Sequence, residues 1–153
     1  MMGGLNYFIS TNTVSLSGAA LTRKDVDDMM QQIVEAGGKP TLLVCNNWVK
    51  RKINSWYEGY VRTERTESTG GVKIDYIETE WGELSILRSQ WCPVHRLYFL
   101  QPEYIGFLPL REFYSEPLAK TGDAMKGQLI GEFTLVVRNE KAHGMITSIS
   151  TTS

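Results

Sequence analysis

Hydrophobic residues at helical spacing predict a first helix between residues 22 and 36. Five apolar positions recur at intervals of three and four residues, which places them on one helical face. They are Val26, Met29, Met30, Ile33 and Val34. Thr22 stands where an N-cap is expected, three residues before Asp25. Gly37 and Gly38 follow, and glycine commonly ends helices. We therefore expect this helix to bury one face in a core.

A short strand and a second helix are predicted next. The apolar run Thr41–Cys45 follows Pro40 and is typical of a buried strand. Aromatic and aliphatic residues between positions 48 and 60 then form a stripe at helical spacing. Lys50, Arg51 and Lys52 lie mostly outside that stripe. We interpret these three cations as a solvated helix face, with nucleic-acid binding as the less favoured alternative.

Residues 72–108 have the pattern of several short strands. Val72, Ile74 and Tyr76 alternate with polar residues, and Trp81-Gly82 marks a turn into a second limb that contains Leu84 and Ile86. Two more β-like runs cover 96–100 and 104–108, and we expect Pro109 to end the second. Residues 62–71 show no periodicity and predict a surface loop.

The longest alternating pattern runs from residue 129 to residue 138. Leu129, Phe133, Leu135 and Val137 share one face with Gly131, and Ile130, Glu132, Thr134, Val136 and Arg138 share the other. About ten residues is long for a strand in a globular domain. Because the second face is also partly apolar, we expect this strand to belong to a sheet that extends beyond the compact part of the molecule.

Composition and charge exclude several classes of protein. With 153 residues, the chain is long enough for one domain with its own core. Its 16 basic and 17 acidic residues give a net charge of −1, whereas a dedicated DNA-binding domain is normally strongly basic. Cys45 and Cys92 are too few for a disulfide framework. There is no continuous apolar run of about 18 residues, so we predict no membrane partner.

Candidate chemistry is sparse. Cys92 and His95 are three residues apart, which leaves a small α/β hydrolase as an alternative. No third group is evident to orient them, so we expect a buried cysteine beside a surface histidine. We expect the acidic residues near the Trp81 turn to face solvent, with metal coordination less favoured; they are Asp75, Glu78, Glu80 and Glu83. The sequence thus predicts no catalytic residue, cofactor, metal or small-molecule substrate.

The segment Leu118–Gly144, with its two charged turns around the long strand, resembles the terminal part of a major capsid protein family of tailed bacteriophages. Gly37-Gly38 with the following strand, and the Glu80–Gly82 turn, are similar to other parts of the same family. The resemblance implies an α+β protein with the Hong-Kong-ninety-seven-type capsid fold. In that fold, residues 1–21 would form an extended arm or linker. Residues 22–116 would form an axial-domain-like region, and 117–153 the long strand and turn of the peripheral domain.

The same resemblance implies a structural role for the chain. It would be a subunit, or the C-terminal half of one, that assembles with copies of itself through pentamers and hexamers into an icosahedral shell. That shell would be the virion capsid, built in the bacterial host cytoplasm, with only non-specific proximity to packaged DNA. Another phage structural protein, such as a tail or connector protein, is a further alternative.

Charged turns and loops are the predicted subunit contacts. Mixed charge suits contacts that set register more than affinity. The candidates are Arg62, Glu64, Arg65, Glu67, Lys120, Asp123, Lys126, Arg138, Glu140 and Lys141.

Overall fold

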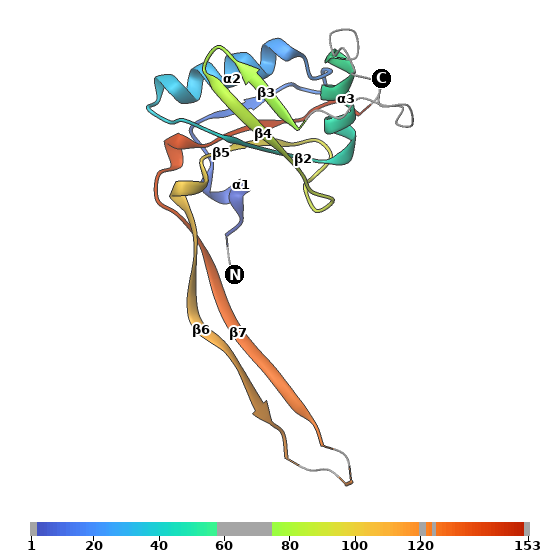
Figure 1. The fold of residues 1–153 in the computed structure, drawn as a ribbon, viewed down its shortest axis with the longest axis vertical. Coiled ribbons are helices and arrows are strands. Elements are labelled where there is room, and N and C mark those ends of the chain that lie inside the picture. Colours follow the sequence, from blue (N-terminus) through green and yellow to red (C-terminus); the bar gives the residue numbers. More distant parts are fainter. Residues whose placement is uncertain (1–2, 58–74, 120–121, 124, 152–153) are drawn as a thin grey trace, which may run out of the picture.

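The computed structural model describes residues 3–57, 75–119, 122–123 and 125–151. It shows two parts, which we call the body and the arm (Figure 1). The body holds α1 (Leu5–Phe8), β1 (Thr13–Ser15), α2 (Arg23–Glu35), β2 (Leu42–Cys45), α3 (Asn47–Tyr57), β3 (Tyr76–Thr79), β4 (Gly82–Arg88), β5 (Leu97–Leu100) and β8 (Gly144–Thr147). The arm is a hairpin of β6 (Ile105–Pro117) and β7 (Gly127–Val137), flanked by the 3-10 turns η1 (Pro102–Tyr104) and η2 (Glu140–Ala142).

The body is built on a six-stranded mixed sheet with the order β1-β8-β5-β2-β4-β3. The pairs β1–β8 and β2–β4 are parallel, and the other neighbouring strands are antiparallel. Parallel neighbours need long connections, and α3 lies in the one between β2 and β4. The result is the predicted α+β architecture.

The first predicted helix is confirmed, including both of its ends. The Thr22 hydroxyl accepts from the Asp25 N–H, and the Asp25 carboxylate accepts from the Thr22 N–H at 2.8 Å, which forms a capping box. At the other end, Gly37 takes a φ of +88°. The N–H groups of Gly37 and Gly38 donate to the carbonyls of Val34 and Ile33, each at 2.9 Å. These two bonds form a Schellman motif.

Both long helices contribute to one core on the same face of the sheet. α2 contributes Val26, Met29, Met30 and Ile33, and α3 contributes Val49 and Ile53. They pack with buried strand residues such as Phe99. Val34, the fifth predicted core position of α2, is only half-buried. The second face of the sheet carries a smaller cluster around Tyr98 and Ile9.

The N-terminal residues are part of the body, which corrects the prediction of an extended arm over 1–21. Residues 5–8 form α1, and β1 pairs with β8 along the sheet edge. Ile9 and Leu21 are buried, and the buried amide of Asn12 donates to the carbonyls of Lys141 and His143. The sequence pattern did not reveal this because a three-residue strand is too short to show periodicity.

The predicted boundary at residues 116 and 117 falls inside the arm. β6 ends at Pro117 and pairs with β7, so both belong to one hairpin. β8 then returns to the body sheet, so residues 117–153 do not form one unit. Pro109 does not end β6 as we predicted. In a two-stranded ribbon each strand has a free edge, which tolerates a residue without an N–H group.

The predicted hairpin turn at Trp81-Gly82 is confirmed, but its first limb is β3, which overlaps the predicted run only at Tyr76. Val72 and Ile74 lie outside the described residues. Leu84 and Ile86 are buried as predicted. Ile77 is the buried residue of β3, whereas Tyr76 is 63% exposed. Successive strand residues point to opposite faces, so the inward position was misassigned by one residue.

Candidate assembly surfaces

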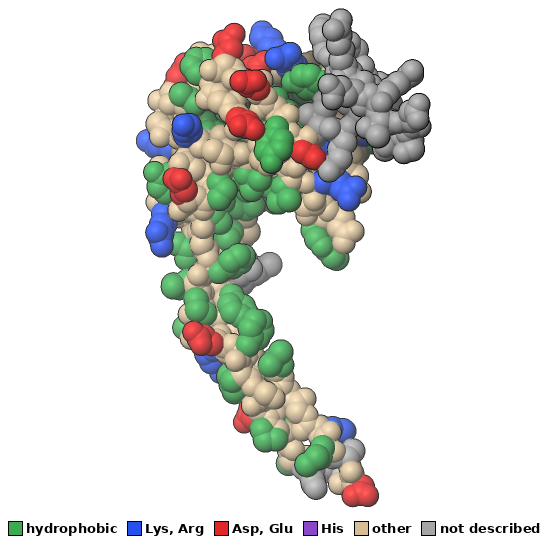
Figure 2. Space-filling view, viewed as in Figure 1, with side chains coloured by type: hydrophobic (Ala, Val, Ile, Leu, Met, Phe, Trp, Pro, Cys, Tyr) green, Lys and Arg blue, Asp and Glu red, His purple; other side chains and the backbone are tan. Residues whose placement is uncertain are grey.

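The arm exposes apolar side chains over most of its length (Figure 2). Phe107 is 76% exposed, Leu110 80% and Leu129 71%. Leu108, Phe113 and Met125 are also exposed. A ribbon of two strands has no third element against which to bury these residues. The arm therefore presents an unpartnered surface within the described subunit.

Aromatic residues organise one face of the arm. Phe113 of β6 and Phe133 of β7 lie with their ring centroids 4.7 Å apart. Gly131 makes room for them, because a Cβ there would lie 2.6 Å from the Phe113 ring. Arg111 donates to Glu132 with two hydrogen bonds of 3.0 and 2.8 Å across the strands. This exposed ion pair fixes register and contributes little stability.

The arm joins the body at a polar cluster that includes the half-buried Glu140 and the buried His143. Glu140 accepts from the N–H groups of Ser10 and Thr11 at 2.7 and 2.5 Å, and from the Thr11 hydroxyl at 2.6 Å. His143 is fully buried, and its Nδ1 accepts from the Gln101 N–H at 3.2 Å. Gln101 immediately precedes η1, and His143 follows η2, so this bond joins the two chains that enter and leave the arm.

Two titratable groups in this cluster have shifted pKa values. Partial burial raises the pKa of Glu140, but the hydrogen bonds from Thr11 and Ser10 outweigh it and lower the pKa below its usual value. Burial lowers the pKa of His143, opposed by the nearby Glu140. The folded state thus favours a charged Glu140 and a neutral His143.

The predicted contact residues fall into three groups. Arg62, Glu64, Arg65, Glu67 and Lys120 lie outside the described residues. Asp123 and Lys126 are exposed near the tip of the arm, and Arg138 and Lys141 are exposed near its root. Glu140 is engaged within the subunit, as described above, because its carboxylate ties the N-terminal segment to the arm root.

Apolar residues of β6 are the surface that sequence reasoning missed. Ending the strand at Pro109 left Leu110, Phe113 and Tyr114 without a role. The sequence did carry a signal for this longer strand, because a strand as long as β7 needs a pairing partner of similar length. Matching the lengths of the two strands would have extended β6 to residue 117.

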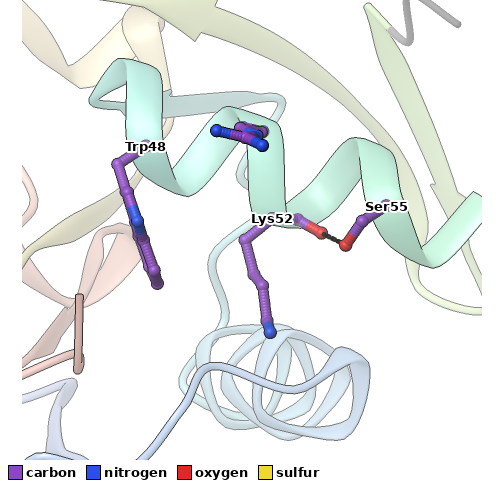
Figure 3. Close-up of a pocket in the computed structure, with 4 residues that line it drawn as sticks. Trp48, Lys52 and Ser55 are labelled. Carbon is purple, nitrogen blue, oxygen red and sulfur yellow. Dashed lines mark hydrogen bonds between the residues drawn. The ribbon is translucent and has the colours of Figure 1, made fainter. Parts of the chain in front are cut away.

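The pattern of the second helix is confirmed over Asn47–Tyr57, and its cations lie on a hollowed surface. Trp48 and Lys52 project from the same side of α3, and the Ser55 hydroxyl donates to the Lys52 carbonyl at 2.6 Å (Figure 3). Lys50 forms an ion pair with Asp75 at 2.9 Å. Lys50 is thus largely buried and paired, so the predicted solvated face is reduced to the exposed Arg51 and the half-buried Lys52 beside the partly exposed Trp48.

Cys92 and His95 do not form a nucleophilic pair. The Cys92 sulfur is buried and lies 3.7 Å from the carbonyl oxygens of Pro93 and Arg96, while His95 Nδ1 donates to the Ile149 carbonyl at 2.8 Å. Burial raises the pKa of Cys92, and it raises the pKa of Cys45 to about 12. Neither thiol is activated as a nucleophile.

Among the described residues, no group of three or more His, Cys, Asp or Glu side chains is placed to hold a metal ion. In those ranges no helix has the length and apolar character needed to cross a bilayer.

The fold is similar to several solved structures. The chain in the holo-SrpI encapsulin complex from Synechococcus elongatus PCC 7942 matches with a TM-score of 0.66 and 11% identity, over 98% of this chain and 57% of that one. The satellite phage P4 procapsid matches with a TM-score of 0.50 and 10% identity, over 83% and 39%. A virus-like particle from Pyrococcus furiosus gives a TM-score of 0.49 at 13% identity, over 90% and 55%.

The encapsulin and procapsid matches confirm the predicted capsid fold. This chain spans a little over half of the encapsulin chain it matches, 57% of its length. Among curated proteins no sequence matches this chain. A family model described as the SU10 major capsid protein matches residues 1–150, almost the whole sequence. The chain therefore belongs to the SU10 major capsid protein family.

Proposed function

We propose that this chain is a structural subunit of a bacteriophage capsid, that it assembles with copies of itself into a closed shell, and that it has no catalytic role. Family membership supports the capsid assignment. The observation that supports self-assembly is the exposure of hydrophobic residues on the arm, a ribbon that projects from the body (Figure 1).

The physics of a two-stranded ribbon supports an intermolecular partner. An isolated hairpin is marginally stable in water, and stable sheets need more strands or a packed face. Fully burying one Leu or Phe side chain contributes about 1.5–3 kcal/mol. Several such residues along the arm provide a large driving force for association that a single described subunit leaves unused.

In this proposal the body is the axial part of the subunit and the arm is part of the peripheral sheet. The apolar faces of the arm supply the association energy, and the charges at its tip and root set the register. Asp123, Lys126, Arg138 and Lys141 remain our proposed contacts, since all four are exposed. Opposite charges influence register and partner choice more than affinity.

The proposed setting is the virion capsid, with pentamers and hexamers assembled in the host cytoplasm around a packaged genome. The chain carries a net charge of −1. A nearly neutral subunit can enclose DNA without holding it tightly, because non-specific binding depends on clustered positive charge.

Polar substitutions in the arm test this proposal in the intact gene product. Phe107→Ser with Leu129→Ser removes two exposed apolar groups, so folding of the body should be unchanged while the number of particles seen by electron microscopy falls at least about tenfold. Gln128→Ser with Thr134→Ser, both in β7, is the control within the same arm, and we expect normal particles. Normal particle numbers for the first variant would contradict the proposal.

The reactivity of Cys92 separately tests the proposal that the chain has no catalytic role. A buried thiol with a raised pKa should react slowly with an alkylating probe at neutral pH in the native protein. Rapid stoichiometric labelling of native Cys92 would instead favour the hydrolase alternative.

A further inference from the structure

Charge is segregated along the β3–β4 hairpin. The ion pair between Lys50 and Asp75 holds α3 next to the start of β3. The turn between β3 and β4 lies at the other end of the hairpin (Figure 1). Cations gather at the α3 end, and carboxylates gather at the turn.

The cationic end has two adjoining hollows that share Arg51. One, of about 230 Å³, is lined by Trp48, Arg51, Lys52 and Ser55. The other, of about 540 Å³, includes Lys50, Arg51 and Arg88. Among the described residues, Lys50 alone of these four cations has an ion-pair partner. We call Arg51, Lys52 and Arg88 the basic face.

The acidic end carries carboxylates on both sides of the hairpin turn. Glu78 and Glu83 are directly opposite each other in the strand register, and both are exposed. Like charges in such a pair destabilise a hairpin. Glu80 lines a hollow of about 260 Å³ together with Asp28 and other residues of α2. We call Glu78, Glu80 and Glu83 the acidic turn.

Carboxylates of α2 lie beside the acidic turn, since Asp27 and Asp28 line the same hollow as Glu80. Burial raises the pKa of Asp27, Arg23 lowers it, and the neighbouring charges of Glu80 and Asp28 raise it further. Arg23 lies 3.8 Å from Asp27 and thus neutralises only part of the cluster. A cation from outside the subunit would relieve the repulsion that remains.

The two charged surfaces do not neutralise each other within one subunit. Asp75 and Glu80 are five residues apart along β3, which corresponds to about 16 Å of extended strand. A contact between the basic face and the acidic turn must therefore join two molecules. Such a contact uses different surfaces on the two partners, so it is head-to-tail, and repetition of it closes a ring when the rotation allows.

We propose that the basic face of one subunit docks on the acidic turn of the next copy of this chain, and that this contact builds the capsomer ring. The inference rests on the proposed function. It adds which residues form one interface and states that this interface is head-to-tail. A second copy is favoured over nucleic acid because the chain itself supplies the complementary surface. The 16 Lys and Arg of the whole chain are outnumbered by 17 Asp and Glu, so the protein as a whole does not attract polyanions.

Charge reversal and its rescue test the contact in the intact gene product. Arg51→Glu with Lys52→Glu, or Glu80→Lys with Glu83→Lys, places like charges across the interface. Each pair should weaken ring formation at least about tenfold at low salt, as measured by native mass spectrometry and sedimentation. The variant that carries all four substitutions restores opposite charges and should assemble to within about twofold of wild type.

A mixture of the two reversed proteins sharpens the test. Each alone repels itself, but alternation of the two restores attraction at every contact. Alternation requires an even number of subunits, so an equimolar mixture should form even-numbered rings only. Lys24→Glu with Lys39→Glu is the control. It changes the net charge as much as Arg51→Glu with Lys52→Glu does, but at other surface positions, and should leave assembly unchanged. Far-UV circular dichroism and Tm verify that each variant is folded.

The possible failures are distinguishable. Normal rings from the folded Arg51→Glu/Lys52→Glu protein, or no rescue by the four-fold variant, would overturn the interface and leave the capsid function standing. Normal rings that retain less DNA would overturn it in favour of a nucleic-acid contact. If the wild-type gene product itself formed no rings or shells, the proposed function would fail first.

Discussion

The body and the arm use the same hydrophobic residue types for different purposes. Phe99 in β5 is completely buried, whereas Phe107 in β6 is 76% exposed. In the body, a six-stranded sheet and two helices cover one another's apolar faces. In the arm, two strands pair only with each other, so each keeps a free edge and both faces stay open. The body buries its own apolar faces, whereas the apolar faces of the described arm stay exposed within the subunit.

This difference shows why a hydrophobic pattern does not by itself identify a core. Alternation in β7 is as regular as in any strand of the body, yet Leu129 and Phe133 are exposed. The pattern reports that a face is suited to burial, and the partner can be the same chain or another molecule.

The largest expected contrast comes from truncating one phenylalanine in each region. Phe99→Ala should lower the free energy of unfolding of the body by about 3–5 kcal/mol, because it leaves a cavity in a packed core. Phe107→Ala should change it by less than about 0.5 kcal/mol, as for other exposed positions. Urea denaturation followed by tryptophan fluorescence measures both. Equal losses at the two sites would mean that the arm is buried in the isolated subunit.

Glycine substitution separates the two regions with a smaller effect. A Cβ at Gly38 would lie 2.7 Å from the Ala142 backbone and 2.8 Å from the Ile33 side chain, whereas a Cβ at Gly106 in the arm has open space. Gly38→Ala should cost about 1–3 kcal/mol through overpacking. Gly106→Ala should be neutral or slightly stabilising. Thermal unfolding gives both values, and a neutral Gly38→Ala would show that α2 and η2 are not in close contact.

Loss of the α2 cap should have a smaller effect, restricted to the body. Thr22→Ala removes the hydroxyl that accepts the Asp25 N–H, at a cost of about 1 kcal/mol, and Thr22→Ser keeps the bond and most of the stability. The exposed arm substitution Thr134→Ala is the matched control and should leave Tm unchanged. An equal loss for the Ala and Ser variants of Thr22 would rule out the cap as the cause.

Acid should weaken the junction of the two regions at His143 before it affects Glu140. The usual pKa of histidine is 6.5. Below that pH, residue 143 binds a proton in the unfolded chain, whereas burial disfavours protonation of His143 in the folded chain. The free energy of unfolding therefore falls as the pH falls. Glu140 has a lowered pKa, so its contribution is present above pH 4.5 and is lost below it. Tm measured from pH 7 to about pH 2 should therefore decline in two steps.

Two histidine variants test the first step. In His143→Asn, the amide oxygen can accept the Gln101 N–H but does not titrate, so the first decline, which begins near pH 6.5, should disappear. His95→Asn changes an exposed ring and should keep the wild-type decline. If both variants declined as wild type does, His143 would not be the group responsible.

The sequence by itself determined the elements that depend on local chemistry. The Thr22–Asp25 cap, the Gly37 helix end, the core face of α2, the turn at Trp81 and the length of β7 all follow from neighbouring residues, since caps and periodicity act within a few positions. The resemblance of Leu118–Gly144 to phage capsid proteins identified the family that the match over residues 1–150 shows.

Only the tertiary structure decided which segments meet. It placed β1 beside β8 and tied Glu140 to Ser10 and Thr11, more than 120 residues away in the chain. It also continued β6 through Pro109 and left the arm uncovered. Pairing between distant segments depends on how all the elements pack together, and short strands have too few residues to encode their partners.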